Sequence, residues 1–271
     1  MTLQLSGLSE RLPEPRQEFY GQPRLKMPLL VSGKDKKGKV VDVPREPASF
    51  AYVLERRMTA PEEVRPTWQE VYFFTGDGST AGTDGDHLLV LDAQYLRKLT
   101  PESELYEGAL VLPPGSWHEL KGRKEKVLHL TAEEVRGAHG QGYVKKEKVW
   151  TPANRVVGKI WEGTDNFPGL ARGRIDVREY AQLVSESSPS SSSLLTVYFN
   201  QTTKEGKPTM RSFVAESFGL LSVALGSNSL AYADGRLVGL APEMYIANQK
   251  VLEARVQSAF DEEKTIFKIR I

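Results

Sequence analysis

Short apolar segments separated by polar turns are the dominant pattern of the chain. Most of them carry β-branched or aromatic side chains and are bounded by Gly, Pro, Asn, Asp or Ser. This pattern is typical of β-strands. The predicted strands are residues 29–31, 40–43, 70–75, 87–91, 105–112, 126–131, 143–150, 155–161, 194–200, 209–218 and 265–271.

Two segments have the apolar spacing of an amphipathic helix instead. Residues 49–58 end before Pro61, and residues 176–185 begin with Asp176, a residue type favoured at helix N-termini. Residues 252–260 fit both the strand period and the helix period, so both structures remain open there. We therefore predict an α+β, β-rich fold with antiparallel or mixed sheets, many short strands and few short helices.

Three turns predict hairpins between neighbouring strands. A Gly- and Lys-rich turn covers 33–38, and a second polar turn covers 204–208. Asp234 and Gly235 give the sharpest signal, because an Asp-Gly pair accommodates the positive φ angles of a tight hairpin turn.

Proline and serine content divides the chain. Residues 1–28 contain Pro13, Pro15, Pro23 and Pro28, which disfavour a helix or a central strand and predict an extended N-terminal arm. The sequence SESSPSSSS at 185–193 has the low complexity of a flexible linker or an exposed loop. We expect a main β-rich domain over 29–184, and over 194–271 either a smaller β-rich domain or an extension of the main sheet.

Composition excludes several classes of protein. The 271 residues carry a formal net charge of +1, which argues against a global polycation and against an acidic disordered chain. Without Cys there is no disulfide framework and no thiolate nucleophile or ligand. The N-terminal segment lacks the apolar run of a secretory signal, and no apolar stretch is long enough to span a bilayer. We expect a soluble cytoplasmic protein, with a virion as the other location.

The segment 76–87, which has the sequence GDGSTAGTDGDH, is the first candidate for chemistry. Asp77, Asp84, Asp86 and His87 supply oxygen and nitrogen ligands for a divalent cation, and the glycines allow the backbone to fold around it. The spacing does not fit an EF-hand loop. We expect a Gly- and Asp-rich loop joining two strands.

Residues 74–79, Phe-Thr-Gly-Asp-Gly-Ser, resemble the first-strand TDGS motif of the ribonuclease H family. The resemblance implies that Asp77 is a magnesium ligand. It covers six residues, is interrupted by Gly76, and has no identifiable helix Glu at a suitable distance.

Basic residues with aromatic residues interleaved among them are concentrated between 117 and 159. Cations for phosphates beside aromatic faces for bases are typical of surfaces that hold single-stranded nucleic acid. The Lys-rich turn at 33–38 adds to this surface. The candidate residues are Lys36, Lys37, Trp117, Lys121, Arg123, Lys124, Tyr143, Lys145 and Lys146.

No established catalytic motif is present. The phosphate-binding, dinucleotide-binding and G-x-S-x-G patterns are all missing. An N-terminal arm, many short strands and polar hairpins are typical of subunits that contact their neighbours. We predict a non-enzymatic assembly or interaction protein, with a virion-like assembly as one form, no cofactor, no membrane partner, and self-association or other subunits as partners. The alternatives are single-stranded nucleic-acid binding and a divalent-metal-dependent hydrolase centred on 76–87.

Overall fold

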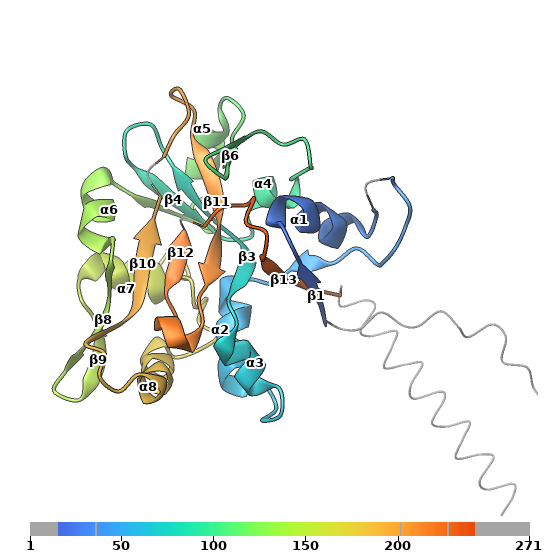
Figure 1. The fold of residues 1–271 in the computed structure, drawn as a ribbon. Helices are drawn as coiled ribbons and strands as arrows, with labels where there is room; N and C mark the ends of the chain where they lie inside the picture. Colours follow the sequence, from blue (N-terminus) through green and yellow to red (C-terminus); the bar gives the residue numbers. More distant parts are fainter. Residues whose placement is uncertain (1–15, 36, 201, 227, 242–271) are drawn as a thin grey trace, which may run out of the picture.

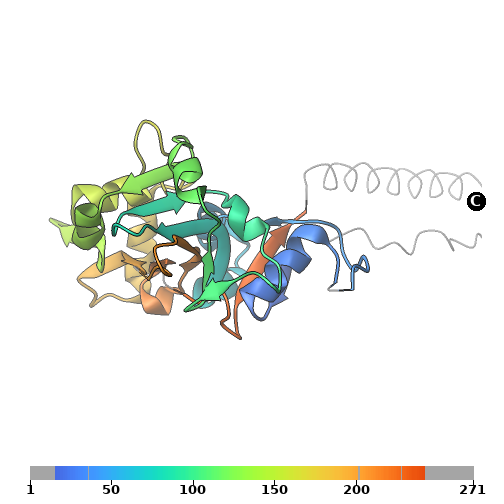
Figure 2. The same ribbon diagram turned by 90° about the horizontal axis from the view of Figure 1, so that it is seen from above.

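A mixed sheet of thirteen strands forms the centre of the protein, and short helices pack against it (Figures 1 and 2). The structure is a computed structural model that describes residues 16–35, 37–200, 202–226 and 228–241. Neighbouring strands follow the order β1-β13-β3-β11-β12-β10-β8-β9, with β2 beside β13, β4 between β3 and β7, and β6 between β11 and β5. The predicted α+β, β-rich class is confirmed.

The strands are β1 (Arg16–Tyr20), β2 (Glu46–Pro47), β3 (Phe73–Ala81), β4 (His87–Val90), β5 (Leu105–Tyr106), β6 (Ala109–Val111), β7 (Val127–Leu130), β8 (Gln141–Lys146), β9 (Val149–Pro152), β10 (Ser193–Phe199), β11 (Thr209–Ala215), β12 (Ala224–Gly226) and β13 (Arg236–Leu240). The helices are α1 (Pro23–Ser32), α2 (Phe50–Thr59), α3 (Arg65–Glu70), α4 (Gln94–Arg97), α5 (Ser116–Lys121), α6 (Ala132–Ala138), α7 (Arg155–Trp161), α8 (Val177–Ser187) and the 3-10 turn η1 (Phe218–Leu220).

The sheet separates two apolar cores. Successive side chains of a strand point to opposite faces, and Phe73 and Phe74 accordingly enter different cores. On the first face, Phe50 of α2, Trp161 of α7 and Tyr180 of α8 are fully buried. On the second face, α1, α4 and α5 contribute their apolar side chains.

Strand β3 lies in the middle of the sheet, and this corrects the expectation that 76–87 is a loop. All nine of its residues are buried. Glycine permits close packing here: a Cβ added to Gly76 would lie 3.1 Å from the Cβ of Pro47, and one added to Gly78 would lie 3.1 Å from the sulfur of Met210. The turn therefore begins only after Ala81, and the predicted strand at 70–75 begins at Phe73, because Glu70 ends α3.

Both predicted helices are confirmed, and each has a local N-terminal cap. The Ser49 side chain accepts a hydrogen bond from the Tyr52 backbone N–H at the start of α2. The Asp176 carboxylate accepts from the Arg178 and Glu179 N–H groups at the start of α8. Side-chain caps of this kind satisfy backbone donors that the helix leaves unpaired.

The predicted hairpin over 29–43 is wrong, because residues up to Ser32 form α1. Pro23 stands at the start of this helix, where its fixed φ is favourable. Gly33 closes the helix in the left-handed conformation and donates its N–H to the Leu29 carbonyl. The described part of the predicted arm thus contains β1, which pairs with β13, and the first turns of α1.

The predicted strand at 155–161 is also wrong, because this segment is α7. The Asn154 side chain accepts from the Val157 N–H at 3.0 Å and so caps the helix. Val157, Ile160 and Trp161 then lie on one buried face at helical spacing.

Two predicted strands each contain a tight hairpin. Residues 105–112 divide into β5 and β6, and residues 143–150 divide between β8 and β9. The turns have positive φ at both central residues, 47° and 77° at Glu107 and Gly108, and 48° and 75° at Glu147 and Lys148. Such a pair reverses the chain with the twist of the flanking strands.

The other two predicted turns do not join paired strands, although the 204–208 turn itself forms, with an antiparallel bridge between Lys204 and Lys207. Strands β10 and β11 exist as predicted on both sides of 204–208, but β12 lies between them in the sheet. After Asp234 and Gly235, β13 pairs with β1 and not with the residues before the turn. In both cases the strand pairs with a segment that is distant in the sequence and not with the strand on the other side of the turn.

Strands on both sides of the Ser-rich run belong to one sheet, since β10 pairs with β8 through Leu194 and Tyr143. The predicted elements at 252–260 and 265–271 lie outside the described residues. In the part of the chain that the structure describes, no helix has the length and apolar character needed to cross a membrane.

Candidate functional site

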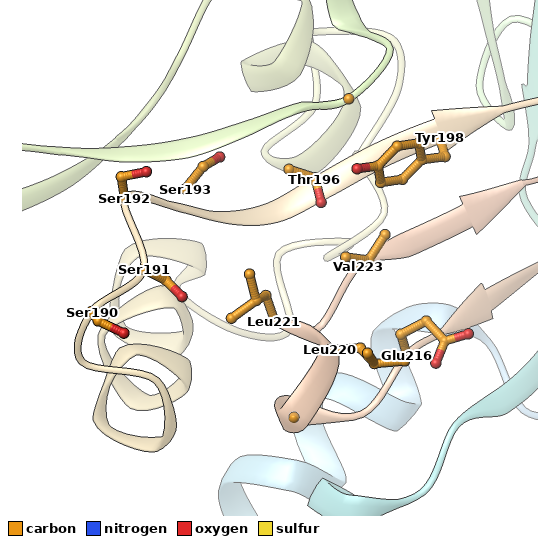
Figure 3. Close-up of a pocket in the computed structure, with 12 residues that line it drawn as sticks. Ser190, Ser191, Ser192, Ser193, Thr196, Tyr198, Glu216, Leu220, Leu221 and Val223 are labelled. Carbon is orange, nitrogen blue, oxygen red and sulfur yellow. The ribbon is translucent and has the colours of Figure 1, made fainter.

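A groove of about 690 Å³ lies between the Ser-rich run and η1, at one end of the sheet (Figure 3). It opens where β10 and β12 begin and β11 ends, because β12 is parallel to β10 and antiparallel to β11. The residues that line it are Gly140, Ser190, Ser191, Ser192, Ser193, Thr196, Tyr198, Glu216, Gly219, Leu220, Leu221 and Val223.

The floor of the groove comes from three neighbouring strands. Thr196 and Tyr198 of β10, Val223 before β12, and Glu216 after β11 lie side by side on one face (Figure 3). The alternate residues of β10, including Val197, enter the core on the other face. Sheet alternation therefore gives a mixed polar and apolar surface above the apolar core.

Serine hydroxyls form one wall and leucines form the other. Ser190 and Ser192 are exposed in the segment that follows α8. Across the groove, Leu220 of η1 is 59% exposed and is adjacent to Leu221 (Figure 3). Leu220 therefore adds an exposed apolar side chain to a groove that is otherwise lined largely by polar groups.

The leucine wall has a strained backbone. Leu221 and Ser222 have φ angles of 61° and 51°, and Leu195 on β10 has a φ of 53°. The Leu195 N–H donates to the Leu221 carbonyl at 3.1 Å, and the Ser222 N–H donates to the Ser217 carbonyl at 2.9 Å. Non-glycine residues in this conformation cost free energy and persist only where surrounding contacts hold them.

Arg57 of α2 supplies much of that support from below. Its side chain is fully buried, and its five N–H donors have five neutral acceptors. They are the carbonyl oxygens of Trp68, Val71 and Ala215 and the hydroxyls of Tyr180 and Ser222, at 2.9 to 3.1 Å. One side chain thus links α2, α3, α8, β11 and the turn after η1.

Glu216 is the charged side chain on the floor. It is 6% exposed, and burial raises the pKa of its carboxyl group, opposed by the nearby Arg57 charge and by hydrogen bonds from the Ser217 backbone and Asn228. Tyr198 is 36% exposed, and its ring packs edge-on against His139 at 5.4 Å. Among the described residues that line the groove there is no Lys or Arg.

Asp77, the first predicted metal ligand, is bound by two backbone N–H groups and by Arg172. Its Oδ2 accepts from the Phe50 N–H and its Oδ1 from the Asp92 N–H, both at 2.8 Å. It also forms an ion pair with Arg172, which binds Asp92 at 3.0 Å. The side chain is fully buried, and burial raises the pKa of this carboxyl while Arg172 opposes the shift. Asp77 therefore anchors the start of α2.

The other three predicted ligands point to separate partners. Asp86 binds His129 at 2.6 Å and accepts from the Ala132 N–H at 2.9 Å. His87 is fully buried with its Nε2 2.8 Å from the Asn200 carbonyl, and burial lowers its pKa. Asp84 is exposed and accepts from the Asp86 N–H. Across the residues that the structure describes, no three carboxylates or imidazoles are grouped to hold a metal ion.

The predicted nucleic-acid residues occupy different parts of the fold. Trp117, Lys121, Arg123 and Lys124 belong to α5 and the turn after it, far from the β8–β9 hairpin with Lys145 and Lys146 (Figure 1). Arg123 pairs with Glu119, and Lys145 lies over the Trp150 ring.

Tyr143, another predicted nucleic-acid residue, is a core residue. Its hydroxyl donates to Glu162 at 2.7 Å, and burial and this bond raise its pKa. Lys37 is exposed in the turn after α1, and Lys36 lies outside the described residues. The structure does not bring the described members of this set into one groove.

Sequence reasoning missed Glu216, Tyr198 and Leu220 as site residues, because their strands meet only through the order β10-β12-β11. The composition of the Ser-rich run predicts a flexible linker or an exposed loop, but nothing in the local sequence shows what faces it. The burial of Arg57 could have been predicted from the sequence. Its spacing places it on the same helical face as the apolar residues Phe50, Val53 and Leu54.

Comparison with known proteins defines the class of fold. No protein-family model and no curated protein sequence matches the chain. A similar solved structure is described as "Accommodation of massive sequence variation in Nanoarchaeota by the C-type lectin fold". The TM-score is 0.55 at 12% sequence identity, and the match covers 83% of this chain and 97% of the other. At this identity the similarity shows the fold alone, a β-rich fold like that of the C-type lectins.

Proposed function

We propose that this protein is a non-enzymatic interaction protein that binds a partner protein through the groove between the Ser-rich run and η1. The observation that carries the proposal is the groove itself, where serine hydroxyls, an aromatic ring, exposed leucine and one carboxylate share a concave surface. Binding sites are typically concave, largely apolar and furnished with a few oriented polar groups.

The construction of the groove supports this proposal. Its walls are loops, and loops carry binding residues on a rigid scaffold. The scaffold beneath is fixed by the five hydrogen bonds of Arg57. The similar structure is described as accommodating massive sequence variation. A fold that tolerates such variation is suited to presenting different contact residues.

The assembly role predicted from the sequence is a form of the same proposal, with a second copy or another subunit as the partner. The two alternatives have less support, because the predicted basic residues and the predicted metal ligands are dispersed over the described part of the fold.

A cross-linking experiment tests the proposal. The chain has no Cys, so a Ser192→Cys variant carries one benzophenone label in the groove. Thr83→Cys is the matched control, since Thr83 is exposed in the turn after β3, at the opposite end of the sheet. Labelled protein is irradiated in an extract of the cells that produce it, and cross-linked proteins are identified by mass spectrometry.

We expect one partner, or a second copy of this chain, to be cross-linked from position 192 and not from position 83. The purified partner should then bind the unlabelled protein and lose affinity for Leu220→Asp. Equal cross-linking from both positions, or unchanged affinity of Leu220→Asp, would contradict the proposal.

A further inference from the structure

The groove has one anionic end. Glu216 contributes its carboxylate to the floor, and the described lining residues include no basic side chain. Arg57 lies below, but its five donors are all used by neutral oxygens. The Ser217 backbone and Asn228 donate to Glu216, but none of the ion pairs among the described residues includes it, so a ligand that supplies a cation would find an anionic acceptor there.

An apolar path leads to this carboxylate. Leu220 and Val223 lie beside Glu216 on the floor and wall (Figure 3). A flexible aliphatic stem can cover such surface while its polar end reaches a charged group, which is how lysine side chains pack on proteins.

The remaining polar groups are hydroxyls and one aromatic ring. Thr196 and Tyr198 border the same floor on β10, where Val223 separates them from Glu216, and the Tyr198 hydroxyl points toward Thr196 (Figure 3). Hydroxyl oxygens accept hydrogen bonds, so these two side chains can bind other donors of the same partner.

These features distinguish an ammonium from a guanidinium. Arginine prefers two parallel hydrogen bonds to one carboxylate, but Glu216 is already engaged by the Ser217 backbone and Asn228. An ammonium group is a compact point charge, and it needs only one acceptor oxygen of the carboxylate.

We infer that the groove recognises a lysine side chain of the partner protein, with the ammonium at Glu216 and the methylene stem along Leu220 and Val223. The inference rests on the proposed function, because it names the chemistry of the partner at the same groove.

Capped amino acids test the inference without a known partner. The probes are the N-acetyl, N-methylamide derivatives of lysine, norleucine, arginine and Nε-acetyllysine, which share a backbone and differ in the charged end. Binding to the full chain is measured from the backbone amide shifts of Ser190–Ser193 and Leu220 in two-dimensional NMR spectra.

We expect the lysine probe to bind about tenfold more tightly than norleucine, as one charge-assisted hydrogen bond would give. Glu216→Gln should remove this preference, and Glu133→Gln, an exposed change on α6, should leave it intact. Leu220→Ser is a second variant, at an exposed position. It should weaken lysine and norleucine alike.

Three results would overturn the inference: equal binding of lysine and norleucine, tighter binding of arginine, or no shift with lysine up to its solubility limit. The cross-linking experiment distinguishes this failure from failure of the proposed function. If a partner cross-links at Ser192 but the lysine probe does not bind, the groove is still a protein-binding site, and the inference that it recognises lysine is wrong.

Discussion

The guanidinium of Arg57 donates a hydrogen bond of 2.9 Å to the hydroxyl of Ser222, a residue with a φ of 51°. The same hydroxyl lies 2.5 Å from the Tyr180 hydroxyl. A buried cation on α2 thereby holds the strained turn that forms the leucine wall of the groove. The fold and the candidate site share this one contact network.

Replacing Arg57 with Lys should destabilise the protein by about 2–4 kcal/mol, because at least two buried acceptors lose their donors. The free energy of unfolding in urea measures the loss. Arg174→Lys is the control, since Arg174 forms an exposed ion pair with Glu55 and such pairs contribute little. A loss no larger than that of the control would show that the five hydrogen bonds do not stabilise the turn.

Glu216 should make stability depend on pH. Burial raises the pKa of this carboxyl in the folded protein. Between the unfolded and folded pKa values the folded state holds more protons, so its stability falls as pH rises. Glu216→Gln cannot titrate and avoids this loss. The difference in unfolding free energy, variant minus wild type, should therefore increase from pH 4.5 to pH 7.5.

Urea unfolding at several pH values checks the sign, with Glu133→Gln as the exposed control. A difference that decreases with pH would mean that Glu216 is stabilised as the carboxylate, and the pKa shift would then have the opposite direction.

Asp77 should be a structural residue. Asparagine at this position has one acceptor oxygen for two backbone N–H donors, and it removes the charge partner of Arg172. We expect Asp77→Asn to cost about 2–4 kcal/mol. The cost should be the same in EDTA and in magnesium chloride.

A double-mutant cycle with Arg172→Gln measures the coupling between the two side chains, expected at about 1–3 kcal/mol. A stability loss that appears only with magnesium present would instead support the metal site implied by the resemblance to ribonuclease H.

Helices with a capping residue at their start could be predicted from the sequence. Strand positions that depend on pairing with a distant segment could not. Ser49 and Asp176 cap α2 and α8, and both helices were predicted. The Glu147-Lys148 turn was missed because neither residue is a usual left-handed residue. Strand β12 separates β10 from β11 by a pairing that no neighbouring residue indicates.

The same distinction applies to the candidate site. Asp77 lies in a Gly-rich segment that is typical of an exposed loop, yet the glycines there allow close packing in the sheet centre. The floor of the groove is formed by β10, β12 and β11, and their order in the sheet differs from their order in the sequence. Its exposed serines could be recognised from composition, whereas Glu216 could not.

The glycines at 137 and 142 give a paired test of this packing. A Cβ added to Gly142 would lie 2.1 Å from the Leu194 carbonyl oxygen, so Gly142→Ala must displace β8 from β10. We expect a loss of about 3 kcal/mol or more, as for other severe overpacking. Gly137 is in α6, where an added Cβ meets nothing within 4 Å.

Gly137→Ala should therefore stabilise the protein by about 0.5–1 kcal/mol through helix propensity. Thermal unfolding of the two variants beside wild type should give midpoints that change in opposite directions. An equal decrease of both midpoints would contradict this explanation. The close approach of β10 would then not be the cause of the loss at Gly142, and the pairing of Tyr143 with Leu194 would be wrong.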